Sequence, residues 1–139
     1  MAVMTQRVSL NSDGNCDIRN ITDEVAEAVW VSGVINGTVT VFLAGSTAGI
    51  STIEFEGGVI RDLEVMWDRL VPKEMTYQHD RAWGDGNGHS HVRASLLGPS
   101  LVVPFGDGRL FLGTWQQIIL IDFDNQPRIR EIILQIMGE

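Results

Sequence analysis

The stretch Ile118-Ile119-Leu120-Ile121-Asp122-Phe123 is an almost unbroken run of large apolar side chains. A turn sequence, Asp124-Asn125-Gln126-Pro127, follows it directly. Because the run does not alternate with polar residues, it predicts a strand that is apolar on both faces. The rest of the chain predicts only two main helices, so we expect one face of this strand to be covered by a neighbouring copy of the chain.

Outward from this strand, short apolar or alternating segments bounded by Gly, Pro, Asn and Asp predict further strands. We expect strands at residues 3–10, 16–20, 38–43, 50–55, 101–105, 109–112 and 128–137. Helices are predicted at residues 23–32 and 59–70, where apolar side chains recur at helical spacing, and a short helix at residues 90–97. Thr22 is expected to accept hydrogen bonds from the first-turn amides of the first helix.

Turn-length connections between the later strands favour antiparallel pairing. The sequence therefore predicts an α+β fold, a curled antiparallel β-sheet or sandwich with two main helices. No internal repeat or linker interrupts the chain, so residues 1–139 are interpreted as a single domain.

Bulk composition excludes several classes of partner. The formal charge is -8 over 139 residues and the basic residues are scattered singly, which argues against nucleic acid. No apolar run reaches membrane-spanning length, so we expect no membrane partner. The single Cys16 excludes an internal disulfide and fits a reducing interior. We expect a cytoplasmic protein.

All three histidines of the chain, His79, His89 and His91, lie within thirteen residues around a glycine-rich run. Together they could form a three-nitrogen site for a divalent metal, magnesium or zinc, with an open position for water or substrate. Residues 89 and 91 would share a face of a strand but diverge by about half a turn on a helix. The alternative is that one or two of the rings are loop residues bonded to backbone carbonyls.

Backbone amides and hydroxyls near the histidines are candidates for substrate binding. Gly86 and Gly88 could present amides to an anion, although their spacing does not match the dinucleotide-binding fingerprint. Ser46 and Thr47 lie in a break between two predicted strands, where hydroxyls more often satisfy a turn than act as nucleophiles. A tryptophan in the position of Trp115 is more often part of a core.

Several motifs, in this order and spacing, resemble the YjbQ-like family, also called UPF0047. The motifs are Ser46-Thr47-Ala48, Tyr77-Gln78-His79-Asp80, Asn87-Gly88-His89-Ser90-His91, Leu112-Gly113-Thr114-Trp115-Gln116 and Pro127-Arg128-Ile129-Arg130. The resemblance extends over nearly the whole chain. In one place the chain departs from the family pattern, because Gly45 stands where many members have a histidine.

The resemblance implies an α+β homotrimer and, for some members, a secondary thiamine-phosphate synthase activity. That transferase reaction couples a thiazole phosphate with a pyrimidine pyrophosphate and uses magnesium on the pyrophosphate. The resemblance also implies a polar cleft in which His79, Asn87 and His91 are catalytic, with Trp115 and Gln116 nearby.

Two functions follow from these observations. The first is an enzyme that acts on a phosphorylated small molecule through a histidine-lined cleft, with the histidines as metal ligands or as acid and base. The second is a non-catalytic trimeric module that binds a metal or a small ligand.

Overall fold

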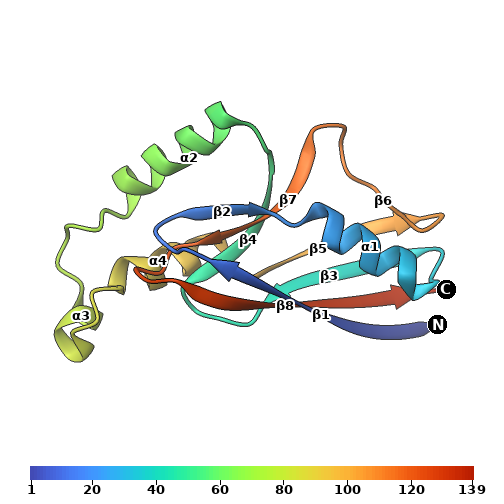
Figure 1. Ribbon diagram of the computed structural model, residues 1–139, viewed down its shortest axis with the longest axis horizontal. Helices are drawn as coiled ribbons and strands as arrows, with labels where there is room; N and C mark the ends of the chain where they lie inside the picture. The colour runs from blue at the N-terminus through green and yellow to red at the C-terminus, as the bar shows by residue number, and fades with distance from the viewer.

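The computed structural model describes residues 1–139 as two antiparallel sheets and four helices (Figure 1). The strands are β1 Ala2–Ser12, β2 Asp17–Asn20, β3 Gly37–Leu43, β4 Ala48–Glu54, β5 Ser100–Gly106, β6 Arg109–Leu110, β7 Gln116–Asp122 and β8 Arg128–Gly138. The helices are α1 Thr22–Ser32, α2 Gly57–Leu70, α3 Gln78–Trp83 and α4 Gly88–Leu97. The α+β class and the antiparallel pairing are confirmed.

Local differences from the predicted elements are small, with one exception. The helix α3 was not predicted, because six residues are too few to show an amphipathic period. The helix α4 begins two residues before the predicted start, and β6 ends two residues before the predicted end. Thr22 does not cap α1: its hydroxyl accepts from the Ile118 amide, and Asn20 Oδ1 accepts from the Thr22 amide instead.

The two sheets face each other across the main core. The larger sheet has the strand order β1-β8-β3-β5-β6, and the smaller one has the order β2-β7-β4. Apolar side chains of both sheets and of α1 fill the space between them. A second, smaller core lies on the other face of the three-stranded sheet and includes residues of α2 and α4.

The central strand β7 contributes to both cores, as its continuous apolar sequence requires. Ile118 and Leu120 pack into the core between the sheets, whereas Ile119 and Ile121 pack into the second core. All four side chains are at most 1% exposed. The expectation that a neighbouring copy covers one face of this strand is therefore wrong, because α2, α4 and the residues around them cover it within the chain.

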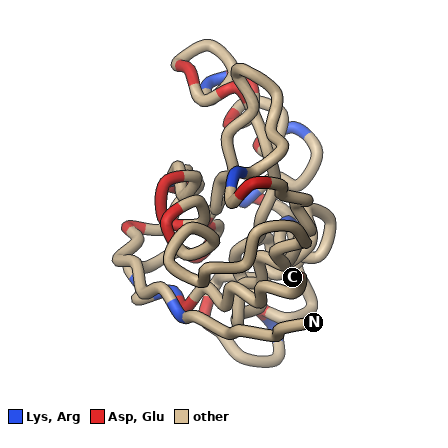
Figure 2. Tube along the Cα trace, turned by 90° about the vertical axis from the view of Figure 1, so that its right-hand side faces the viewer, with Lys and Arg blue, Asp and Glu red and all other residues tan.

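Charged residues are distributed along the whole chain. Figure 2 shows Lys and Arg as short, separated segments along the chain, with acidic residues more frequent. None of the helices combines the length and the apolar character needed to cross a membrane.

Candidate functional site

Two of the three histidines meet at the end of the molecule formed by α3 and α4 (Figure 1). His79 lies in the first turn of α3 and His91 in the first turn of α4. Their ring centroids are 4.4 Å apart, with an angle of 55° between the planes. The glycine-rich loop between the helices makes this approach possible, since Gly84 and Gly86 adopt the left-handed backbone conformation that reverses the chain.

Asn87 and Asp85 hold the ring of His79. The Asn87 amide is assigned with its nitrogen toward these two side chains, because the opposite orientation would place its oxygen against acceptors only. The nitrogen then donates to Asp85 Oδ1 at 3.0 Å and to His79 Nε2 at 2.9 Å. When His79 Nε2 carries a proton, it can instead donate to Asp85 Oδ1 at 3.2 Å. His79 thus has a hydrogen-bond partner in either protonation state.

His91 has no comparable partner. Its ring forms no side-chain hydrogen bond or ion pair and is half-buried at the edge of a hollow of about 180 Å³. The hollow lies between α4 and the loop that joins β3 to β4, and it is lined by Gly45, Ser46, Ala48, His91, Ala94, Ser95 and Pro99. The ring nitrogens of His91 therefore have no hydrogen-bond partner within the chain.

His89 does not join this pair, so the predicted three-histidine metal site is not formed. Its side chain is 3% exposed and its ring centroid lies 6.4 Å from that of Tyr77. The reason is the helical backbone of residues 88–97, which directs positions 89 and 91 to different sides. No group of three His, Cys, Asp or Glu side chains in the structure is arranged to hold a metal ion.

The buried position of His89 predicts a pH-dependent stability. Burial, together with the positive charges of Arg93 and Lys73, lowers the pKa of His89. The unfolded chain therefore takes up this proton at a higher pH than the folded chain, so the contribution to stability is present above about pH 6.5 and is lost as the pH falls below it. We expect the unfolding free energy to decrease between pH 7 and pH 5 by at most about 1.4 kcal/mol per pH unit from this residue.

Urea denaturation of the natural protein and of His89→Gln at several pH values measures this contribution. The variant should lose part of the pH dependence in this window. If the unfolding free energy changes with pH equally steeply in the two proteins, His89 takes up its proton equally well in the folded and the unfolded chain.

The two hydroxyls of the β3–β4 loop have different surroundings. Ser46 is exposed and lines the hollow beside His91. Thr47 is buried, and its hydroxyl donates to Asp124 Oδ2 at 2.8 Å and accepts from Arg130 Nη2 at 2.7 Å. Of the two predicted ligand-binding hydroxyls, the structure therefore leaves only that of Ser46 available.

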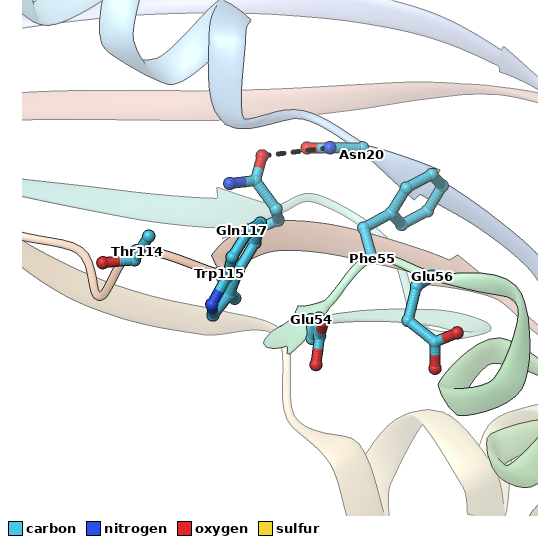
Figure 3. Close-up of a pocket in the computed structure, with 7 residues that line it drawn as sticks. All are labelled: Asn20, Glu54, Phe55, Glu56, Thr114, Trp115 and Gln117. Carbon is cyan, nitrogen blue, oxygen red and sulfur yellow. Dashed lines mark hydrogen bonds between the residues drawn. The ribbon is translucent and has the colours of Figure 1, made fainter.

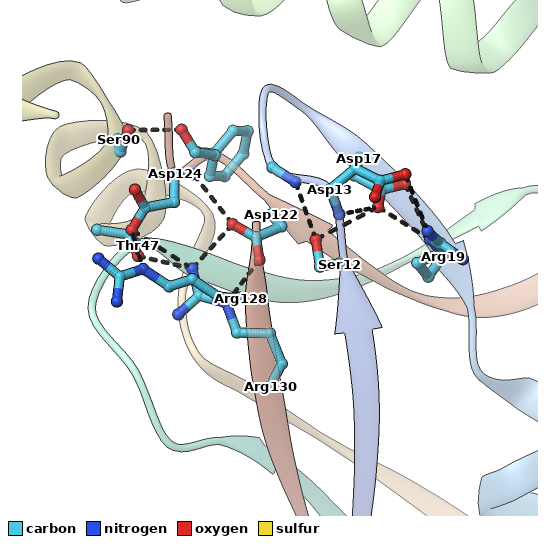
Figure 4. A network of polar contacts seen from close by, with 12 residues as sticks. Ser12, Asp13, Asp17, Arg19, Thr47, Ser90, Asp122, Asp124, Arg128 and Arg130 are labelled. Atoms are coloured by element: carbon cyan, nitrogen blue, oxygen red, sulfur yellow. Dashed lines mark hydrogen bonds and ion pairs between the residues drawn. The ribbon is translucent and has the colours of Figure 1, made fainter. Parts of the chain in front are cut away.

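The hydroxyl of Thr47 belongs to a buried polar network at the ends of β7 and β8 (Figure 4). Arg130 forms two hydrogen bonds to the carboxylate of Asp122, at 2.6 and 2.8 Å, and Arg128 binds Asp124 at 2.6 Å. Burial alone would raise the pKa of Asp124, but hydrogen bonds from Thr47 and Arg128 lower it. The network fixes the loop that carries Gly45 and Ser46.

The predicted glycine amides are only partly available. The Gly88 N–H donates to Asp80 Oδ1 at 2.8 Å, so it cannot serve a ligand. A side chain at this position would meet Tyr77 Cβ at 2.5 Å, which explains the glycine by close packing. Gly86 is exposed in the loop and forms no hydrogen bond through its amide, so it stays a candidate.

Trp115 and Gln116 lie far from the histidines within one chain. Trp115 is 71% exposed and lines a different pocket, of about 390 Å³, with Glu54, Phe55 and Glu56 (Figure 3). Ala48 lines the histidine hollow at the start of β4, six residues before Glu54, and six residues of extended strand span about 20 Å. Within a single chain, Trp115 is therefore not part of a core, and it does not share a pocket with the histidines.

Gln116 has a structural role at the same end of β4. Its side chain accepts from the Gly113 amide and donates to Thr52 Oγ1 at 3.1 Å. These bonds hold the connection that leads into β7.

Two contributors to the site were missed in the sequence. Asp85 was a visible candidate, since its carboxylate lies between His79 and Asn87 in the glycine-rich segment. Arg130 could have been recognised from strand parity: it shares the even-numbered positions of the buried Ile132 and Leu134, whereas Ile129 is 76% exposed.

The chain is similar to known proteins over nearly its whole length. The model of the family described as UPF0047 protein YjbQ-like matches residues 6–139. The chain belongs to the YjbQ-like, or UPF0047, family. It is 37% identical over 139 residues to a UPF0047 protein of Methanothermobacter thermautotrophicus, covering 100% of this chain and 95% of the relative. A UPF0047 protein of Archaeoglobus fulgidus is 37% identical over 128 residues, covering 92% of this chain and 97% of that protein.

Crystal structures of related proteins have the same fold. A YbjQ-like protein of unknown function from Sulfolobus solfataricus P2 is similar to this YjbQ-like chain with a TM-score of 0.94 and 32% identity, over 99% of both chains. A protein of the yjbq/upf0047 family from Clostridium acetobutylicum has a TM-score of 0.87 and 37% identity, over 95% of this chain and 99% of that one.

Proposed function

We propose that this YjbQ-like protein is an enzyme that acts on a phosphorylated small molecule, with His91 as the acid–base group. The observation that carries the proposal is the pairing of His79 and His91, in which one ring is held by hydrogen bonds and the other is free at the hollow. A general acid or base must lie within reach of the proton that it transfers and must keep a defined orientation.

The roles of the two rings differ. Asn87 and Asp85 orient His79, and its ring contacts that of His91 from one side. His79 and Asn87 are therefore positioning residues, whereas His91 touches the ligand. Ser46, on the opposite lip of the hollow, provides a hydroxyl for a hydrogen bond to the same ligand.

The reaction class comes from the family resemblance. A thiamine-phosphate synthase joins a thiazole phosphate to a pyrimidine pyrophosphate, and pyrophosphate is the leaving group. The residues present do not fit a resident zinc ion, since no three ligating side chains converge. Magnesium binds through one or two protein carboxylates and mostly through substrate phosphates, so it would enter with the pyrophosphate.

A direct assay tests this proposal. Purified protein incubated with the thiazole phosphate, the pyrimidine pyrophosphate and magnesium should form thiamine phosphate and release pyrophosphate in equal amounts. Reactions that omit either substrate serve as controls. Absence of thiamine phosphate at high protein concentration would exclude this reaction.

The size of the hollow favours a second candidate, a non-catalytic module that binds a small ligand. Its volume of about 180 Å³ is below the roughly 300–1,000 Å³ of ordinary small-molecule pockets. One chain thus offers space for a small anion more readily than for two substrates. Binding of inorganic phosphate by a protein that forms no thiamine phosphate would support the binding module, whereas turnover would exclude it.

Assembly as a homotrimer is a further part of this proposal. The outer face of the five-stranded sheet is not covered by a helix, and the register places Val3, Met137 and Thr38 side by side on it. Phe42 and Val102 on the same face are 40% and 59% exposed. An apolar, weakly charged face suits contact between copies of an acidic chain, whose other surfaces repel one another.

Light scattering of the purified protein gives the assembly state. We expect a mass of three times 15.4 kDa. A mass of a single chain at micromolar concentration would overturn the trimer.

A further inference from the structure

Arg130 is a nearly buried arginine that does not use all of its hydrogen-bond donors. Its side chain is 6% exposed. Nε and Nη2 donate to Asp122, and Nη2 also donates to Thr47. The remaining nitrogen, Nη1, forms no hydrogen bond and no ion pair within the chain.

This nitrogen is not sealed off from solvent. The one buried side-chain nitrogen or oxygen that lacks a partner in the structure is Trp67 Nε1, so Arg130 Nη1 still has access to the surface. Buried hydrogen-bond donors nearly always have a partner. Because Nη1 has none within the chain and is accessible, it can donate to an acceptor atom of a ligand.

Gly45 explains why Nη1 can be reached. A Cβ atom at this position would lie 3.0 Å from Nη1, closer than about nine in ten ordinary contacts of a Cβ atom. The absence of a side chain therefore keeps open the space beside the guanidinium. The backbone of Gly45 does not need glycine for its conformation, since its φ angle is outside the left-handed region.

The same glycine lines the hollow of the candidate site. Gly45 and Ser46 form one lip of this hollow and His91 forms the other. We propose that the opening left by Gly45, here called the port, lets Arg130 Nη1 bind an anionic group, a phosphate or phosphate ester. The other oxygens of this group would contact Ser46 and His91. This inference rests on the proposed function, because it names the part of the same site that would hold the phosphate.

The charges around the guanidinium limit the expected affinity. Arg130 is already paired with Asp122, and Arg128 with Asp124, so these four charges cancel. The exposed Asp85 lies near His79 and adds a negative charge. Binding then depends on directed N–H and O–H donors and not on a net positive field, and we expect millimolar affinity for inorganic phosphate.

Titration with inorganic phosphate, followed by two-dimensional NMR of the whole protein, tests the port. Phosphate should shift the signals of the residues that line the hollow. Gly45→Ala should weaken binding about tenfold, since its methyl group blocks access to one charge-assisted donor. Ser46→Ala should weaken binding severalfold. Gly57→Ala is the matched control, because a Cβ atom there meets nothing within 4 Å, and it should bind as the natural protein does.

Melting temperatures of all variants separate blocked binding from misfolding. If Gly45→Ala does not fold, Ser46→Ala and His91→Ala still test the other two contacts, and binding that is unchanged in both would overturn the inference. If Gly45→Ala folds and its phosphate affinity is unchanged, the inference is also overturned. The proposed function would still stand if the natural protein synthesised thiamine phosphate. Absence of phosphate binding to the natural protein would reject the port, and the assay would then decide the proposed function separately.

Discussion

Replacing Arg130 with methionine is expected to lower the free energy of unfolding by about 3–5 kcal/mol. The variant would leave the carboxylate of Asp122, which is fully buried, without its guanidinium partner. The one hydrogen bond that remains to this carboxylate within the network comes from the Asp124 amide at 3.0 Å. Urea denaturation at pH 7, monitored by circular dichroism, measures the loss.

A matched control lies on the neighbouring strand. Arg7 on β1 forms an ion pair with Glu131 on β8, but both side chains are substantially exposed. Arg7→Met should therefore cost no more than about 1 kcal/mol. In Arg130→Met combined with Asp122→Leu, part of the lost stability should return, because the unpaired charge is removed as well. A loss below about 1 kcal/mol in Arg130→Met would show that the pair contributes no more than a surface contact.

Replacing His91 with alanine is expected to reduce the rate of thiamine-phosphate formation by about 10²- to 10⁴-fold. This range is the usual contribution of a positioned acid or base. His91 is the one histidine that lines the hollow, and the other lining residues are glycine, serine, alanine and proline, so none of them can replace it as an acid or base. The rate constant kcat should fall more than KM rises, since the ring acts in the transition state.

Two comparisons make this result specific. Val92→Ala changes the next residue of α4, which is 46% exposed and does not line the hollow, and it should keep full activity. Asn87→Ala should lower kcat less than His91→Ala does, because Asn87 acts only by orienting His79. Activity of His91→Ala equal to that of the natural protein would refute the acid–base role.

Much of the fold could be predicted because it follows from local pattern. Alternation or a continuous apolar run identified every strand, and the two longer predicted helices were found within two residues of their positions. The clustering of the histidines around a glycine-rich loop also pointed to the correct part of the chain. These features depend on the spacing of residues close together in the sequence, and that spacing is the same whatever packs around them.

The composition of the site could be predicted less well, because it depends on where whole elements lie. Nothing local indicates that His91 lies beside Ala48 at one end of β4 while Trp115 lies beside Glu54 at the other end. The inward direction of Arg130 was visible as parity along β8, but its partners on β7 and in the β3–β4 loop became known only from the sheets.

The sequence by itself determined an antiparallel α+β fold, a central strand apolar on both faces and a histidine-rich loop, since period and composition are properties of the chain alone. Only the tertiary structure decided that the chain covers both faces of β7 itself and that His79 pairs with His91 while His89 is buried. The physical reason is that a side chain is buried or paired by residues of other helices and strands. Which face of an element is buried therefore depends on how the elements pack against one another.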